Sequence, residues 1–278
     1  MSNTIGVIIG YKKDTDLLEK FKQATELGLS CCQLTMWDVT MFCDEYKNKI
    51  EEASKATGMK VSAIWGGWTG PCEWNFSFGP STIGLVPAAY RGQRLKELEM
   101  ASEFAASLGV DTVITHVGFL PENPSDPDYI GTIGALRRLC KNMKAREQTF
   151  LFETGQETPV VLLRAIENIG YDNVGINLDT GNLVLYGKAN PLDALDVFGP
   201  YVRQTHIKDG FYPTCGSLLG KEARAGDGKA NIPAVIKKLC EMGYEGPFLI
   251  EREIKGDEQI RDIIHARDLI SANLPAEN

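Results

Sequence analysis

The feature that most constrains the fold is a regular alternation of short apolar runs and longer amphipathic stretches, repeated eight times. The apolar runs are rich in Val, Ile and Phe, and we interpret them as strands of a buried, parallel sheet. These predicted strands span residues 5–9, 31–36, 60–65, 111–115, 149–152, 174–178, 202–207 and 247–250.

The stretches between the strands have the pattern of helices. In one of them, apolar residues such as Leu95, Leu98 and Ala105 recur on a single helical face. Several stretches end at a glycine, which is a common helix stop. The predicted helices span residues 14–27, 44–57, 91–108, 127–144, 159–169, 191–197, 232–242 and 257–273.

Eight successive strand–helix units are typical of an α/β protein of the (β/α)8 TIM-barrel class. The competing open, doubly wound sheet usually has a glycine-rich phosphate loop after an early strand. The sequence contains neither GxGxxG nor GxxxxGK[ST]. Its 278 residues suit one large barrel, and no composition break divides them. We therefore expect a single TIM-barrel domain over residues 1–278.

Charge and cysteine content exclude several classes of partner. The chain has 29 Lys+Arg against 37 Asp+Glu, a formal net charge of −8. This balance argues against binding to nucleic acid or anionic membranes, because both require clustered basic residues. We find no apolar run that suggests a spanning helix and no signal-peptide pattern. The seven scattered cysteines, without a CxxC motif, indicate a reduced, cytoplasmic protein.

Two predicted strand-to-helix connections are long, one over residues 65–87 and one over residues 209–232. Long connections in a compact domain are usually functional loops. In a barrel these connections lie at the C-terminal face, where active sites are built.

Four successive predicted strands end in side chains that can bind a metal ion. These residues are Glu153, Asp179, His206 and Glu251. Three carboxylates that converge without compensation repel one another, and a divalent cation removes this cost. Carboxylate oxygens with one imidazole suit Mn²⁺ best, with Mg²⁺, Co²⁺ or Zn²⁺ as alternatives. We expect one divalent ion at this face.

The same segments carry a family resemblance. Residues 152–157 (FETGQE), 177–182 (NLDTGN), 205–209 (THIKD) and 249–251 (LIE) resemble the xylose isomerase-like TIM-barrel superfamily. The resemblance is greatest to its sugar phosphate isomerase/epimerase branch, and it spans nearly the whole chain.

The resemblance implies a metal-dependent isomerase or epimerase of a sugar, a sugar phosphate or a related polyol ketone. Glu153, Asp179, His206 and Glu251 correspond to the metal ligands. Glu153 and Glu251 also correspond to the pair that moves the proton, through a metal-stabilised cis-enediolate. Two positions differ from the ketose 3-epimerases: Asn182 replaces a histidine, and Glu157 lies four residues after Glu153 rather than six.

Further side chains are expected to contact substrate or to support the ligands. His116 ends the fourth predicted strand, where the family often has a histidine. Lys208 follows the histidine ligand, Glu157 follows the first ligand, and Arg224 is a loose match to a family arginine. Trp65 and Trp68 can form an aromatic wall for a sugar, or can equally pack within their loop or at a dimer contact.

The sequence also allows alternatives to an isomerase. A metal-dependent dehydratase of the inosose type uses the same machinery but expels water. A non-catalytic barrel is a third interpretation, although all four candidate ligands are present. The superfamily's DNA-repair endonucleases need several histidines, and this chain has three. The family is often dimeric or tetrameric, so a homo-oligomer is a further expectation.

Overall fold

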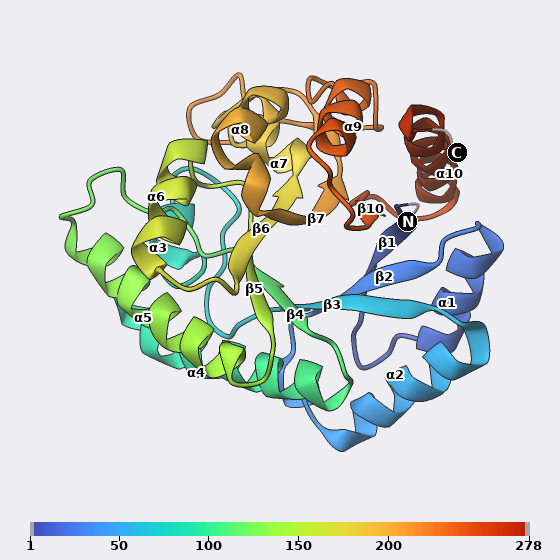
Figure 1. Cartoon of the computed structure of the whole chain (residues 1–278), viewed down its shortest axis with the longest axis horizontal. Coiled ribbons are helices and arrows are strands. Elements are labelled where there is room, and N and C mark those ends of the chain that lie inside the picture. Colours follow the sequence, from blue (N-terminus) through green and yellow to red (C-terminus); the bar gives the residue numbers. More distant parts are fainter. Residues whose placement is uncertain (1–2, 276–278) are drawn as a thin grey trace.

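In the computed structural model, which describes residues 3–275, eight parallel strands close into a barrel (Figure 1). The order around the barrel is β1, β2, β3, β4, β5, β6, β7 and β10, and β10 returns to β1. The strands are Ile5–Gly10 (β1), Cys31–Met36 (β2), Lys60–Gly66 (β3), Thr112–Thr115 (β4), Thr149–Glu153 (β5), Val174–Asp179 (β6), Val202–Ile207 (β7) and Phe248–Ile250 (β10). The predicted TIM-barrel class is confirmed.

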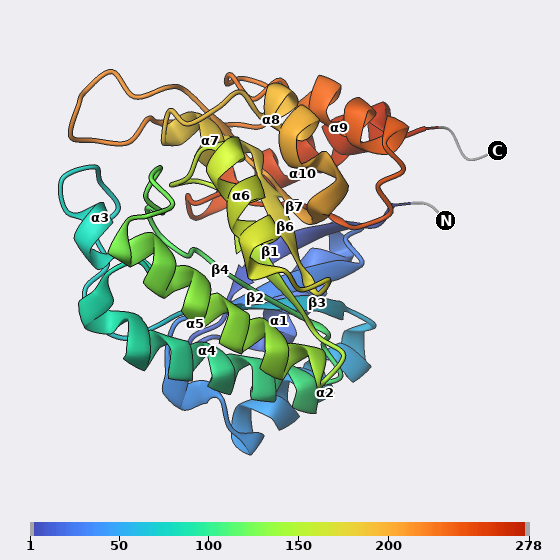
Figure 2. The same cartoon turned by 60° about the vertical axis from the view of Figure 1, so that its left-hand side comes forward.

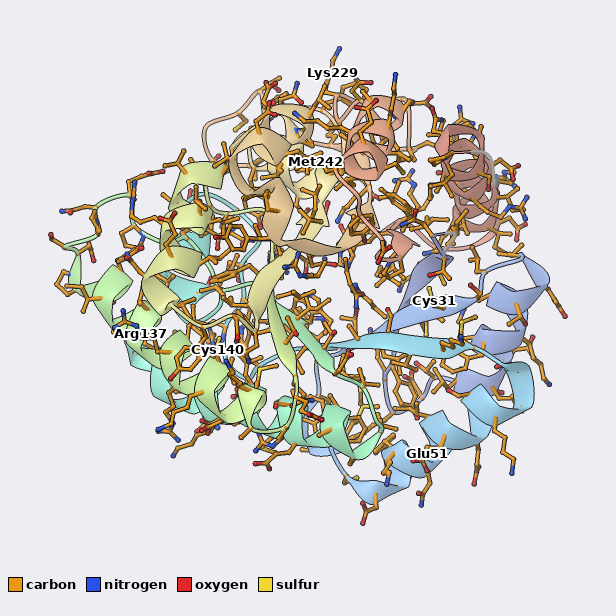
Figure 3. The ribbon with its side chains drawn as sticks, in the orientation of Figure 1. Cys31, Glu51, Arg137, Cys140, Lys229 and Met242 are labelled. Atoms are coloured by element: carbon orange, nitrogen blue, oxygen red, sulfur yellow. The ribbon has the colours of Figure 1, made fainter. Side chains whose placement is uncertain are left out.

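Helices surround the barrel as an outer ring (Figure 1). They are Leu17–Glu26 (α1), Asp44–Thr57 (α2), Ala88–Ser107 (α4), Pro127–Lys144 (α5), Pro159–Ile169 (α6), Pro191–Phe198 (α8), Ile232–Glu241 (α9) and Asp257–Asn273 (α10). The main apolar core lies between this ring and the strands. On α5, for example, Cys140 is buried, whereas Arg137, three residues earlier, is exposed on the outer side (Figure 3). Periodicity therefore located every principal element to within a few residues.

Six short elements were not predicted, and all of them lie in connections. Two are helices, Gly79–Thr82 (α3) and Thr180–Leu185 (α7). Two are 3-10 turns, at Val39–Met41 and Gly199–Tyr201, and a small antiparallel pair joins Asp209–Gly210 (β8) to Glu222–Ala223 (β9). Both long connections protrude on one side of the barrel, α3 in cyan and the loop after β7 in orange (Figure 2). The Phe76 amide donates to the Ser217 carbonyl at 3.1 Å and joins the two.

A fully buried arginine holds the connection between β3 and α4. The Arg94 guanidinium donates to the carbonyls of Thr82 and Gly84, both at 2.7 Å, of Pro71 at 2.8 Å and of Thr69 at 3.3 Å. Such a set replaces the water that these buried carbonyls would otherwise need. The loop that follows β3 is therefore fixed from below by α4.

A buried aspartate, Asp209, likewise holds the connection after β7 by hydrogen bonds to its backbone. Asp209 Oδ2 accepts from the amides of Gly226 and Gly228, at 2.9 and 3.0 Å. Its Oδ1 accepts from the amides of Gly210 and Ala230. A Cβ at Gly228 would lie 2.1 Å from Asp209 Oδ1, so this close approach requires glycine.

Within residues 3–275, no helix combines the length and the apolar character needed to cross a membrane.

Replacing Arg94 by Met should lower the free energy of unfolding by at least about 3 kcal/mol, because four backbone carbonyls lose the hydrogen bonds that Arg94 donates. Urea unfolding measures this change. Lys96→Met, an exposed position on the same helix, is the matched control and should be nearly neutral. Equal losses in the two variants would contradict the anchoring role of Arg94.

Candidate metal centre and active site

The four predicted ligand residues converge because their strands are neighbours. Strand β6 places Asp179 beside His206 of β7, and β10 places Leu249 beside His206 on the other side. Glu251 follows two residues later, at the end of β10, and its amide continues the ladder to the Ile207 carbonyl. Glu153 ends β5 beside Asn177 of β6. The register thus brings all four side chains to the carboxyl end of the barrel.

His206 lies at the centre of this cluster. Its Nδ1 is 3.1 Å from Glu153 Oε1, 3.2 Å from Glu251 Oε2 and 3.8 Å from Asp179 Oδ2. One ligand atom from each of the four residues lies within 4.8 Å of the others. His206, Glu153 and Asp179 are buried, and Glu251 is nearly so. This spacing matches what one ion bound by all four residues requires.

The pKa values of the four clustered residues shift in different directions. Burial would lower the pKa of His206, but Glu153 and Glu251 outweigh it and raise that pKa well above its usual value. Burial would raise the pKa of Glu251, but Lys208 and His206 hold it well below its usual value. Burial also opposes ionisation of Glu153, where His116 and His206 lower the pKa nonetheless. For Asp179 burial dominates and raises the pKa to about 8.

The donor set fits a divalent cation. Asp179 Oδ1 accepts from the amide of Asn182 at 2.8 Å and so caps α7. Its Oδ2 is buried and has no hydrogen-bond partner among the described residues. A buried carboxylate oxygen without a donor needs a proton or a cation. Three carboxylates and one imidazole are suitable ligands for Mn²⁺ or Mg²⁺.

Lys208 is a second buried cation at the edge of the cluster. Its Nζ is 3.4 Å from Glu251 Oε2, 3.9 Å from Asp179 Oδ2 and 3.2 Å from Glu253 Oε1. Burial lowers the pKa of Lys208, but Glu251 and Glu253 outweigh it and raise that pKa well above its usual value. Lys208 therefore stays charged. Both Lys208 and His206 contact Glu251 Oε2.

Above the cluster lies a cavity of about 250 Å³. Glu153, His206 and Glu251 line its floor, and its walls include Trp37, Trp65, Trp74, Tyr186 and Leu219. The aromatic rings pack edge to face or tilted, as for Trp37 and Trp65, whose centroids are 4.8 Å apart. The cavity combines charged groups on one side with apolar rings on the other, as small-molecule sites usually do.

Two of the predicted supporting residues belong to this cavity. His116 lines it, and its Nε2 is 3.5 Å from Glu153 Oε1. Burial lowers the pKa of His116 below its usual value, although Glu153 and Glu251 act in the opposite direction. Trp65 also lines the cavity, and its indole Nε1 donates to Glu153 Oε2. Both side chains therefore orient the Glu153 carboxylate.

Three other predicted residues lie elsewhere. Trp68 is buried behind the wall, packed against Trp37 and 5.3 Å from the Arg94 guanidinium. Glu157 is buried and absent from the cavity lining, and neither of its carboxyl oxygens has a partner among the described residues. Arg224 is exposed and pairs with Asp227 at 2.9 Å, outside the cavity. The loop that carries Arg224 turns away because its glycine amides bind Asp209.

Sequence reasoning missed several residues of the site. Asn182 lines the cavity and its Nδ2 donates to Glu153 Oε1 at 3.4 Å; α7 begins directly after β6 and so keeps this residue at the rim. Trp37 forms part of the wall. Gln33 contacts His206 from below. Only the position of Asn182, three residues after a ligand, gave a signal in the sequence.

The fold and the cluster together define a TIM barrel with a candidate metal site at its C-terminal face. Residues 21–271 match the family model described as xylose isomerase-like TIM barrel, and the chain belongs to this family. The xylose isomerase domain protein from Planctomyces limnophilus is 32% identical, with 98% of each chain covered and a TM-score of 0.90. Uncharacterized protein MJ1311 of Methanocaldococcus jannaschii is 26% identical over 213 residues, 70% of this chain and 68% of that protein.

More distant solved structures share the fold. A xylose isomerase-like TIM barrel protein from Mycobacterium smegmatis, in complex with magnesium, is 20% identical over 98% of each chain, with a TM-score of 0.69. The 3-keto-D-glucoside 4-epimerase YcjR from E. coli is 17% identical over 97% of this chain and 99% of that chain, with a TM-score of 0.70. The probable 3-DHS dehydratase AsbF from Bacillus anthracis is 14% identical over 96% and 99%, with a TM-score of 0.68.

Metal binding should release protons and strengthen as pH rises. His206 has a raised pKa and Asp179 a pKa of about 8, so both carry protons near pH 7 in the metal-free protein. A cation must displace these protons, and affinity should rise by up to about tenfold per pH unit for each proton displaced. Calorimetry with Mn²⁺ at pH 6, 7 and 8, in buffers of different ionisation enthalpy, measures both quantities. An affinity independent of pH, without proton release, would contradict this assignment.

Glu157 should make stability fall as pH rises. Burial raises its pKa to about 8, above the usual carboxyl value, so the neutral form stabilises the fold at low pH. That contribution to stability is lost as the pH rises from the usual carboxyl pKa to about 8, at about 1.4 kcal/mol per pH unit. Glu157→Gln keeps a neutral side chain and should gain stability over the native protein between pH 5 and pH 8 in urea unfolding. Exposed Glu167→Gln is the control, and parallel profiles for all three proteins would refute the effect.

Proposed function

We propose that this protein is a divalent-metal-dependent isomerase or epimerase of a sugar, a sugar phosphate or a related polyol ketone. The observation that carries the proposal is the cluster of four potential ligand atoms within 4.8 Å of one another, in residues of which three line the cavity. Glu153, Asp179, His206 and Glu251 are the proposed ligands, and Mn²⁺ is the favoured ion. A bound divalent ion supplies Lewis acidity that polarises a substrate carbonyl and acidifies the neighbouring C–H.

Glu153 and Glu251 are the proposed proton-transfer pair. Both residues line the cavity. Glu153, at the end of β5, and Glu251, directly after β10, each have an oxygen close to His206 Nδ1, at 3.1 and 3.2 Å. Both have lowered pKa values despite burial, so both are carboxylates able to accept a proton. A base on each side of a substrate allows one carboxylate to remove a proton and the other to return it. Return to the opposite face of the same carbon is epimerisation, and return to the next carbon is isomerisation.

The other residues of the cavity have supporting roles in this proposal. Trp65, His116 and Asn182 orient Glu153, and Lys208 orients Glu251. Trp37 and Trp74 offer ring faces to the C–H faces of a sugar. A volume of about 250 Å³, near the lower end of small-molecule pockets, suits a single sugar unit.

The comparisons support the class of reaction. The chain belongs to the xylose isomerase-like TIM-barrel family, and the solved structures of similar fold include a 4-epimerase and a probable dehydratase. All seven cysteines are free thiols, which supports a reducing, cytoplasmic location. A dehydratase shares the proton abstraction and differs in the fate of the neighbouring hydroxyl, so it is the second candidate.

The reaction can be tested by proton exchange. Metal-reconstituted protein is incubated in D₂O with ketoses, aldoses, their phosphates and inososes, and products are followed by NMR and mass. We expect deuterium at a carbon next to a carbonyl, abolished by EDTA. Glu153→Gln and Glu251→Gln should each lower the exchange rate by about 10²–10⁴-fold. Glu167→Gln, on the exposed side of α6, should exchange at the native rate.

The outcomes separate the candidates. Deuterium in a product of unchanged mass, apart from the label, supports an isomerase or epimerase. Loss of one water from the product indicates a dehydratase. Native exchange by Glu153→Gln removes this residue from the proposed pair. No exchange with any compound, despite bound Mn²⁺, overturns the proposal for these substrates.

A further inference from the structure

His206 has a second hydrogen-bond partner below the site, on the far side of the ring from the carboxylates. Its Nε2 is 2.6 Å from Gln33 Oε1, and Gln33 is fully buried on β2. Strands β10 and β1 separate β7 from β2 in the barrel, so this contact crosses the barrel interior.

The amide of Gln33 is held in one orientation. Its Nε2 donates to Gln204 Oε1 at 2.8 Å and to Asn177 Oδ1 at 3.0 Å. Gln204 is itself fixed, because its Nε2 donates to the backbone carbonyl of Ser62 at 2.9 Å and its Oε1 accepts from the Ser62 hydroxyl at 3.2 Å. A backbone carbonyl can only accept a hydrogen bond, so the direction of the whole chain of amides follows from Ser62.

This direction determines the chemistry of His206. Gln33 must present its carbonyl oxygen to His206, so Nε2 of the ring must carry a proton and donate it. In the neutral ring the free lone pair is then on Nδ1, the atom that faces Glu153, Asp179 and Glu251. A histidine that binds a metal ion is commonly fixed through its other nitrogen in this way.

We infer that Gln33 is a positioning residue that fixes His206 as an Nδ1 ligand with a protonated Nε2. The inference rests on the proposed function, since it concerns the ion that this function requires. Gln33 is not among the residues that line the cavity, and within residues 3–275 His206 is the one candidate ligand to which its side chain hydrogen-bonds. It acts only through the ring.

The test compares Gln33→Met with a matched buried glutamine. Gln148 is also buried, and its amide makes three hydrogen bonds, to Ser102 and to the Val110 carbonyl, away from the site. Both Gln→Met variants should lose stability. Only Gln33→Met should lose Mn²⁺ affinity, by about 10–100-fold in calorimetry. Equal Mn²⁺ affinity of the native protein and folded Gln33→Met would overturn the inference.

A spectroscopic measurement keeps the inference testable if Gln33→Met does not fold. The chain has three histidines, so ¹⁵N-histidine labelling of Zn²⁺-loaded protein gives three separable rings in long-range ¹H–¹⁵N spectra. We expect His206 with a proton on Nε2 and Zn²⁺ on Nδ1, both in the native protein and in Gln33→Glu, which retains the acceptor. Zn²⁺ on Nε2 of the native protein would overturn the inference. Failure of the native protein to bind Mn²⁺ and Zn²⁺ would instead overturn the proposed function.

Discussion

The structure depends on charge balance among three buried carboxylates, one histidine and one lysine. Two unit charges 4 Å apart interact by about 4 kcal/mol at the effective dielectric of a protein site, so imbalance is costly. The pKa of about 8 keeps Asp179 neutral at pH 7, which leaves Glu153 and Glu251 against His206 and Lys208. A divalent ion that displaces the two protons of Asp179 and His206 leaves three negative charges against Lys208 and the ion. The sum is zero in both cases, so binding of such an ion would add no net charge to the cluster.

This balance requires that the side chains stay in place, and the surrounding loops provide the rigidity. Arg94 satisfies the carbonyls of the connection that carries Trp74, and Asp209 gathers the amides of the connection that carries Leu219. Each loop is thus held by one buried charged residue, and the first loop also packs Trp68 and Ile83 into a small apolar cluster. Walls fixed in this way hold the aromatic side chains of the cavity above the cluster.

The barrel and the convergence of the four candidate ligand residues could be predicted because both follow from strand ends. In parallel strands of a barrel, residues at the carboxyl ends share one face, so Glu153, Asp179, His206 and Glu251 meet wherever the strands are assigned correctly. Arg94 could not be predicted, because a charged residue in a helix usually faces solvent. Arg224 lies outside the cavity because loop direction follows from contacts of Asp209, which no local pattern indicates. Gln33 lies within a strand, and nothing in its neighbours reveals a partner 173 positions away.

The neutral side chain at Gln33 follows from the same charge balance. A carboxylate in its place would also accept a hydrogen bond from His206, but it would add a fourth negative charge to a buried cluster whose sum is zero. An amide orients the ring without changing that sum. Buried polar chains of this kind are tolerated only when nearly every donor and acceptor is used, and Ser62, Gln204 and Gln33 meet this condition in sequence. The polar chain in the barrel interior below the site therefore orients the His206 ring without adding charge to the cluster.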